Sequence, residues 1–96
     1  MPAIVYSSRA LGDLERLAAF LVREDHAGAL EAMELIVDAV RVLERHPYMG
    51  RIARGELREL VISRGRTGYV ALYRVAMAKE RIEILAVRYQ REAGYS

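Results

Sequence analysis

Apolar residues recur at helical spacing through the first half of the chain. They fall three or four positions apart in two stretches, which predict helices over about residues 9–24 and 28–45. A polar break containing Gly28 separates the stretches, and Pro47 ends the second one. We expect the face opposite the first apolar stripe to carry charge, with Asp13, Arg16 and Arg23. Two such helices with a short break predict an antiparallel helical hairpin.

In the second half the period changes from helical to alternating. A run of β-branched and aromatic residues near the start of the chain also favours a strand. The predicted strands cover residues 3–7 and about 57–64, 69–76 and 81–89. We treat "HPYMGRIARGE", between helix and strand, as a connector. The order β-α-α-β-β-β predicts an α+β domain spanning residues 1–96. Its N-terminal helical hairpin packs on a small sheet dominated by antiparallel pairs.

Strict alternation assigns strand side chains to the two faces of the sheet. On the last strand Ile82, Ile84, Ala86 and Arg88 are expected to share one side. A register shift of one residue would move every side chain to the other face, so the pattern alone does not say which side meets the helices.

The net charge is only +2, but its distribution is uneven. Residues 1–50 contain five arginines against eight acidic residues, a net charge of −3. Residues 51–96 contain nine arginines and one lysine against five acidic residues, a net charge of +5. The planar guanidinium suits phosphate and carboxylate, so this asymmetry favours an anionic partner. The alternative is a solvated strand face with ordinary ion pairs.

Several kinds of chemistry find no support in the sequence. There are no cysteines, and His26 and His46 lack ligand spacing, so we expect no metal and no cofactor. No serine has a nearby histidine and aspartate in a triad arrangement. No apolar run approaches about 20 residues, and the first ten residues do not resemble a signal peptide. We therefore expect a cytoplasmic protein without membrane contact.

Arginines and tyrosines remain as candidate functional groups, because they bind phosphates and stack on bases. The alternative interpretation is structural, with tyrosines packing a half-buried sheet and arginines extending from it. For Arg74, in a central strand, an ion pair with Glu59 or Glu83 is at least as well supported as a functional role.

The chain resembles the RelE/ParE superfamily of bacterial toxins from type II toxin–antitoxin modules. The resemblance rests on the order and spacing of five segments: "VYSSRALGDLERL", "AVRVLERHPYMGR", "LRELVIS", "GYVALYRV" and "IEILAVRYQRE". It implies a toxin neutralised by a cognate antitoxin whose C-terminal segment wraps around it. The segments are closer to ParE and its plasmid-stabilisation relatives than to RelE, whose nucleases are usually strongly basic.

The resemblance to ParE implies inhibition of DNA gyrase by protein–protein binding, with growth arrest and with no direct DNA binding by the toxin alone. The first alternative is a RelE-like endonuclease that cuts mRNA on the ribosome. Many relatives have a histidine after the arginine of the last strand, whereas this chain has Tyr89 there, which removes one acid–base group. The second alternative is a non-toxic homologue that acts as an interaction module.

Three sets of candidate residues follow from the resemblance and from the basic second half. The residues expected to bind the target are Arg58, Arg64, Arg66, Arg88, Arg91 and Tyr95. Those expected to bind the antitoxin lie on the apolar stripes of the helices: Leu14, Leu17, Leu21, Met33 and Val37. The gyrase-inhibitor interpretation has no catalytic residues. A RelE-like nuclease would use Arg58, Arg64, Arg74, Arg88 and Tyr89.

Overall fold

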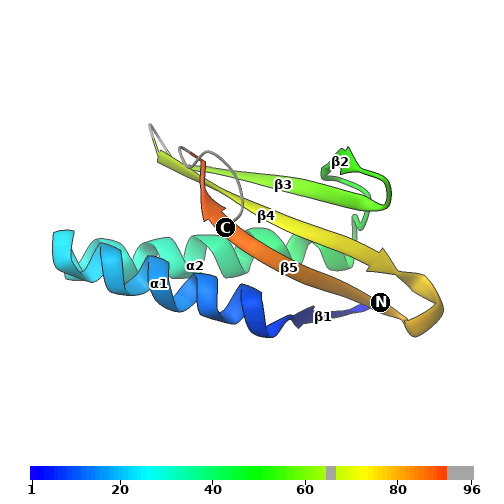
Figure 1. Cartoon of the computed structure of the whole chain (residues 1–96), viewed down its shortest axis with the longest axis horizontal. Helices are drawn as coiled ribbons and strands as arrows, with labels where there is room; N and C mark the ends of the chain where they lie inside the picture. Colours follow the sequence, from blue (N-terminus) through cyan, green and yellow to red (C-terminus); the bar gives the residue numbers. More distant parts are fainter. Residues whose placement is uncertain (65–66, 91–96) are drawn as a thin grey trace.

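The computed structural model describes residues 1–64 and 67–90 of the chain, except for the side chains of residues 63, 64 and 67. Two long helices lie side by side across one face of a twisted sheet (Figure 1). The elements in chain order are β1 (Ala3–Tyr6), α1 (Ser8–Glu24), α2 (His26–Arg41), the 3-10 turn η1 (Val42–Glu44), β2 (Arg51–Arg54), β3 (Leu57–Arg64), β4 (Thr67–Ala76), the 3-10 turn η2 (Met77–Lys79) and β5 (Arg81–Tyr89).

The sheet has the strand order β1-β5-β4-β3-β2. Among the described residues, β1 pairs with β5 in parallel, and the other three pairings are antiparallel. This confirms the predicted α+β class with a helical hairpin on a mostly antiparallel sheet. The connector prediction was wrong for Arg51–Arg54, which form β2. All four of these residues are exposed, so β2 lacks the buried alternation by which a strand is predicted.

A side-chain cap sets the start of α1, and a sharp break sets the boundary between α1 and α2. The Ser7 hydroxyl accepts a hydrogen bond from the Ala10 backbone N–H (3.0 Å) and caps α1. A single extended residue, Asp25, ends α1 and precedes α2, so α2 begins at His26, two residues earlier than predicted. None of the helices in the described residues is long and apolar enough to cross a membrane.

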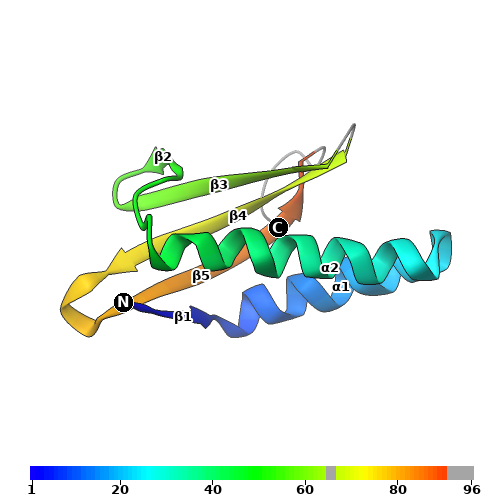
Figure 2. The ribbon, with the colours of Figure 1, turned by 180° about the vertical axis from the view of Figure 1, so that it is seen from behind.

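Both helices lie against the same face of the sheet (Figure 2). Their apolar stripes and that face of the sheet form a single core. Tyr73, in the central strand β4, is fully buried within it. The buried cluster contains Ala10, Leu17, Ala32, Ile36, Val40, Leu43, Leu60, Ile62, Tyr69, Ala71, Tyr73, Ile82, Ile84 and Val87.

A register shift in β5 changes which side chains reach this core. Tyr73 pairs with Ile84 whereas Leu72 pairs with Ala86, so Leu85 is the extra residue of a β-bulge. Beyond the bulge Val87 joins the core. Ala86 and Arg88 therefore do not share a face with Ile82 and Ile84, and the strict alternation expected for this strand was wrong.

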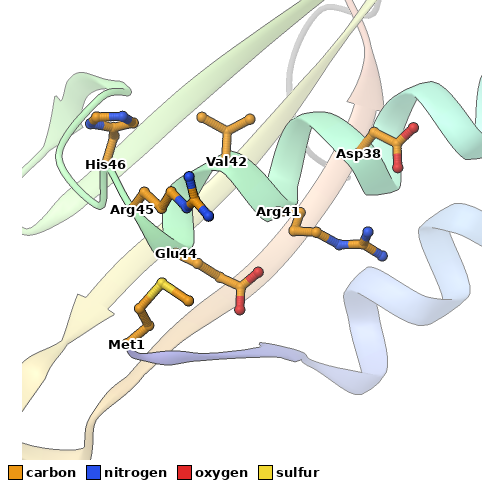
Figure 3. A pocket seen from close by; sticks show the side chains of 7 residues that line it. All are labelled: Met1, Asp38, Arg41, Val42, Glu44, Arg45 and His46. Atoms are coloured by element: carbon orange, nitrogen blue, oxygen red, sulfur yellow. The ribbon is translucent and has the colours of Figure 1, made fainter.

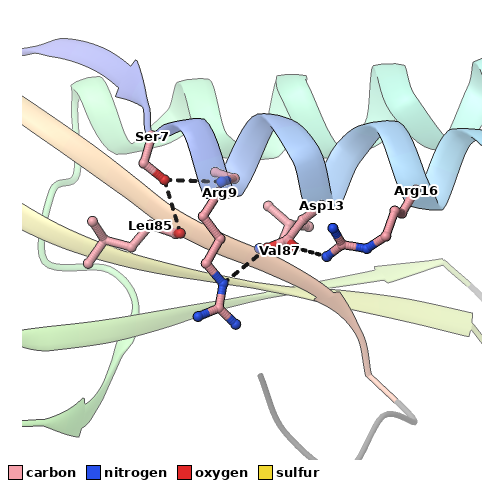
Figure 4. Close-up of polar contacts among 7 residues, drawn as sticks. Ser7, Arg9, Asp13, Arg16, Leu85 and Val87 are labelled. Atoms are coloured by element: carbon pink, nitrogen blue, oxygen red, sulfur yellow. Dashed lines mark hydrogen bonds and ion pairs between the residues drawn. The ribbon is translucent and has the colours of Figure 1, made fainter. Parts of the chain in front are cut away.

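Asp13 is the buried charged residue of the described part of the chain, with 4% of its surface exposed. Its expected place on the face opposite the apolar stripe was wrong. Its Oδ2 accepts a hydrogen bond from the Val87 backbone N–H (2.9 Å), and its Oδ1 is bonded by Arg16. Next to it the Ser7 hydroxyl donates to the carbonyl oxygen of Leu85 (3.0 Å). These contacts join the start of α1 to β5 at the bulge (Figure 4).

Candidate functional site

The sheet face that turns away from the helices carries two ion-pair networks. In the first, Glu59 on β3 lies 3.2 Å from Arg51 and 3.9 Å from Arg88. In the second, Glu83 on β5 accepts hydrogen bonds from the Nε atoms of Arg74 and Arg81, each at 2.9 Å. Each glutamate is paired with two arginines, so each network has a net positive charge.

The network around Glu83 shifts the pKa values of two of its members. The hydrogen bond from Arg74, together with its positive charge and that of Arg81, lowers the pKa of Glu83. The same contact raises the pKa of Arg74. The ion pair that the sequence suggested for Arg74 is therefore confirmed, with Glu83 as its partner. Arg88 is largely enclosed, because only 14% of its side chain is exposed.

A second group of contacts fixes the turn between η1 and β2. The Tyr73 hydroxyl donates to the Pro47 carbonyl oxygen (2.7 Å) and accepts from the Gly50 N–H (2.8 Å). Arg58 donates to the carbonyl oxygens of Tyr48 (3.1 Å) and Gly50 (2.8 Å), and its guanidinium lies 5.1 Å from the centre of the Tyr48 ring. Burial raises the pKa of Tyr73, so its hydroxyl stays protonated and can donate.

Three aromatic rings meet at the end of β5. The ring of Tyr89 lies 5.2 Å from that of Tyr69 on β4 and 6.0 Å from that of Phe20 on α1, edge to face in the second case. Tyr89 also packs against the buried core. Its ring is therefore a packing element between helix and sheet.

Of the predicted target-binding residues, the structure describes the side chains of Arg58 and Arg88. Both make the internal contacts given above, on opposite faces of the sheet. Arg64 ends β3, while Arg66, Arg91 and Tyr95 lie outside the described residues.

The residues suggested for a RelE-like nuclease divide between the two faces of the sheet. Arg58 pairs with Tyr73, and Tyr89 pairs with Tyr69, so both side chains leave the sheet on the helix side. Arg74 and Arg88 belong to the ion-pair networks of the opposite face. The sheet therefore lies between these two pairs, and the side chain of Arg64 is outside the described part of the chain.

The residues predicted to bind an antitoxin differ in exposure. Leu17 is in the core with 6% exposed, and Leu14, Leu21 and Met33 are partly buried against it. Val37 is 39% exposed. Other large apolar residues of this helical region are at least as exposed: Leu11, Phe20, Val22, Leu30 and Val42.

Shallow grooves lie beside the C-terminal half of α2. One, of about 390 Å³, runs between Met1 and the end of the helix (Figure 3). Its lining mixes charges of both signs: Met1, Asp38, Arg41, Val42, Glu44, Arg45 and His46. A neighbouring groove of about 340 Å³ reaches β1, where it is lined by Ile4 and Tyr6. The second groove is mostly apolar but also contains Arg41 and Glu44, so neither groove concentrates charge of one sign.

Sequence reasoning missed Asp13, Gly50 and Tyr73 as organisers of these surfaces. A Cβ atom on Gly50 would lie 2.6 Å from the Tyr73 ring and 2.7 Å from the Glu59 carbonyl oxygen, so the turn requires glycine. The available signal for Asp13 was its position, because it follows Ala10 by three residues and precedes Leu17 by four on the buried stripe.

Comparisons with known proteins find toxins and toxin–antitoxin systems as relatives. A family model described as the ParE toxin of the type II toxin–antitoxin system parDE matches residues 4–94. Toxin RelE3 of Caulobacter vibrioides is 35% identical over 75 residues, which cover 78% of this chain and 82% of that protein. A solved structure of the chromosomal ParDE system from P. aeruginosa matches with a TM-score of 0.79 and 25% identity, over 93% of this chain and 96% of that chain.

Proposed function

This chain belongs to the ParE toxin family of type II toxin–antitoxin systems, and we propose that it inhibits DNA gyrase by protein–protein binding. As the toxin component of such a module it has a cognate antitoxin as a partner. The proposal concerns its target. Membership in a family fixes a fold more firmly than an activity, so the proposal needs support from the residues themselves.

The observation that carries the proposal is the division of the arginines and Tyr89 between two faces of the sheet. Cleavage of RNA needs a base, an acid and stabilised charge around one phosphate. Arg58 and Tyr89 leave the sheet on the helix side, whereas Arg74 and Arg88 are bound to glutamates on the other. Such a separation argues against a single catalytic centre built from these residues, and so favours the gyrase-inhibitor proposal over a nuclease.

The Tyr89 ring gives a second reason. It packs against Phe20, Tyr69 and the core. A catalytic tyrosine would need its hydroxyl beside the reacting phosphate, and an aromatic that stacks on RNA would need a free ring face. Neither role agrees well with a ring held between helix and sheet.

A RelE-like mRNA endonuclease is the second candidate. It is favoured by the 35% identity to a protein named Toxin RelE3 and by the basic second half of the chain. In that case the arginines would stabilise a phosphorane, and the ribosome would have to supply the missing acid–base group. A homologue without toxicity is the third candidate, and growth after induced expression separates it from the other two.

The residues proposed to contact the target remain those expected from the sequence: Arg58, Arg64, Arg66, Arg88, Arg91 and Tyr95. For the antitoxin we propose the helical hairpin, where Val37 is exposed and Leu14, Leu21 and Met33 are partly accessible.

Two assays on the same purified protein test the proposal. The first follows supercoiling of relaxed plasmid by gyrase, and the second maps mRNA ends in a translation extract. We expect loss of supercoiling and intact mRNA. Cleavage of ribosome-bound mRNA with supercoiling unaffected would replace the proposal with the endonuclease alternative.

A further inference from the structure

The turn between η1 and β2 exposes three large apolar side chains. Tyr48 is 58% exposed, Met49 is 61% exposed, and Ile52, at the start of β2, is 68% exposed. Ile52 pairs directly with Arg58, whose guanidinium lies over the Tyr48 ring, so these side chains form one surface. We name Tyr48, Met49 and Ile52 the Tyr48 patch. A hollow of about 630 Å³ adjoins it, lined by Arg45, His46, Pro47, Tyr48 and Met49.

Hydrogen bonds fix the backbone of the turn that carries this patch, from Pro47 to Gly50. The hydroxyl of Tyr73, a fully buried residue, bonds Pro47 and Gly50, and Arg58 bonds the carbonyl oxygens of Tyr48 and Gly50. The Met49 N–H donates to the His46 carbonyl oxygen (3.1 Å). Gly50 has no room for a side chain. The turn is therefore preorganised.

A fixed turn with exposed apolar side chains has the features of a protein-binding hot spot. Aromatic residues, methionine and arginine are enriched at interfaces, and a few of them supply most of the binding energy. A rigid turn loses little conformational entropy of its own when it binds a partner, which raises affinity. Internal packing alone would account for the buried Tyr73, but it does not account for the exposure of Tyr48 and Met49.

The charge around the patch indicates the chemistry of the partner. Arg51 is paired with Glu59, and Arg58 bonds the turn. The remaining exposed charges beside the patch are therefore Arg45 and Arg54 against Glu56. Resting on the proposed function, we infer that the Tyr48 patch docks on an acidic face of the target protein gyrase, with its apolar side chains in a cavity ringed by carboxylates.

The aliphatic members of the patch favour a protein over a nucleic acid. Single-stranded nucleic acids bind through aromatic stacking and phosphate contacts. Met49 and Ile52 offer neither of these, and one face of Tyr48 is already covered by Arg58. Both aliphatic side chains gain by burial in an apolar cavity of a protein partner.

The test measures gyrase binding and gyrase inhibition by the full chain and three variants. Y48S/M49S removes two members of the patch, and R45E/R54E reverses charge beside it. L30S is the matched control, because Leu30 is a 64% exposed apolar residue in α2, outside the patch. We expect Y48S/M49S to raise the dissociation constant for gyrase about tenfold or more. R45E/R54E should slow association, most strongly at low salt. L30S should behave as the unaltered protein.

Melting temperatures establish that each variant is folded. If the unaltered protein inhibits gyrase and Y48S/M49S inhibits it equally well, the docking inference is wrong and the proposed function stands. If the unaltered protein neither binds nor inhibits gyrase, both are wrong. Loss of RNA or DNA binding by Y48S/M49S, with gyrase binding unchanged, would also overturn the inference, because the patch would then be a nucleic-acid site.

Discussion

The carboxylate of Asp13 accepts a hydrogen bond from the backbone N–H of Val87, a residue 74 positions further along the chain. The pairing of β1 with β5 ends at Tyr6 and Ile84, so the next groups on that edge of β5 have no strand beside them. Side chains of α1 and its cap satisfy these backbone groups instead. The Ser7 hydroxyl donates to the Leu85 carbonyl oxygen, and the Asp13 carboxylate accepts from the Val87 N–H. The first turns of α1 therefore continue the edge of the sheet with side chains in place of a strand.

This relationship predicts that Asp13→Ala destabilises the fold. The Val87 N–H would be left buried without its partner, which costs about 1–3 kcal/mol. Asp13→Asn keeps an oxygen acceptor at the same position, so it should be less destabilising than Asp13→Ala. Urea denaturation of the two variants measures the difference. Equal stability of Asp13→Ala and the unaltered protein would show that the bond contributes nothing.

The Tyr73 hydroxyl predicts a second effect on stability. Tyr73→Phe leaves the Pro47 carbonyl oxygen and the Gly50 N–H unpaired, and we expect the free energy of unfolding, measured by urea denaturation, to fall by about 1–3 kcal/mol.

Gly50→Ala should also destabilise the turn, because the new Cβ would meet the Tyr73 ring and the Glu59 carbonyl oxygen. Gly55→Asn is the control, at a glycine with open space around it. Gly55 has φ +56°, a conformation that asparagine tolerates, so this change should leave the stability nearly unchanged.

Glu83 predicts a dependence of stability on pH. The hydrogen bond from Arg74 lowers its pKa below the ordinary value of 4.5, so the folded state binds a proton there less readily than the unfolded state. The stabilisation by this carboxylate is therefore present above pH 4.5 and is lost as the pH falls through the lowered value. Glu83→Gln lacks this contribution. The stability difference between the unaltered protein and Glu83→Gln should shrink on acidification, and a difference constant with pH would contradict the assignment.

Much of the fold follows from the sequence because it depends on local periodicity. The bounds of β3 and β5 match their predicted ranges, since alternating β-branched residues mark both strands. The end of α2 was predicted too late, because Val42–Glu44 form a 3-10 turn that continues into a turn at Arg45 rather than an α-helix. These elements required no knowledge of distant contacts.

The features that were missed all depend on distant contacts. β2 exists because Arg51 and Ile52 pair with β3, and its own residues show no buried alternation. The bulge at Leu85 is fixed by the register against β4. The burial of Asp13 depends on Val87, and the role of Arg58 depends on the turn at Tyr48. Sequence alone therefore identified basic residues in this half of the chain but not the surfaces to which they belong.

The proposed antitoxin surface predicts a pattern of protection from amide exchange. Binding of the antitoxin from the same module should slow exchange of α1 and α2 amides near Met33 and Val37. Amides of β4 near Tyr73 are already within the core and should change least. If the hairpin amides exchange at the same rate with and without antitoxin, the proposed placement is wrong.

Inhibition of gyrase by the purified toxin, with and without its antitoxin, tests the central claim most directly. Relaxed plasmid and gyrase are incubated with increasing toxin, and supercoiled product is measured at each concentration. The account predicts that supercoiling falls to a low plateau and returns when the toxin is saturated with antitoxin before mixing. The result that would contradict it is full supercoiling in the presence of excess folded toxin, when expression of the same protein arrests growth.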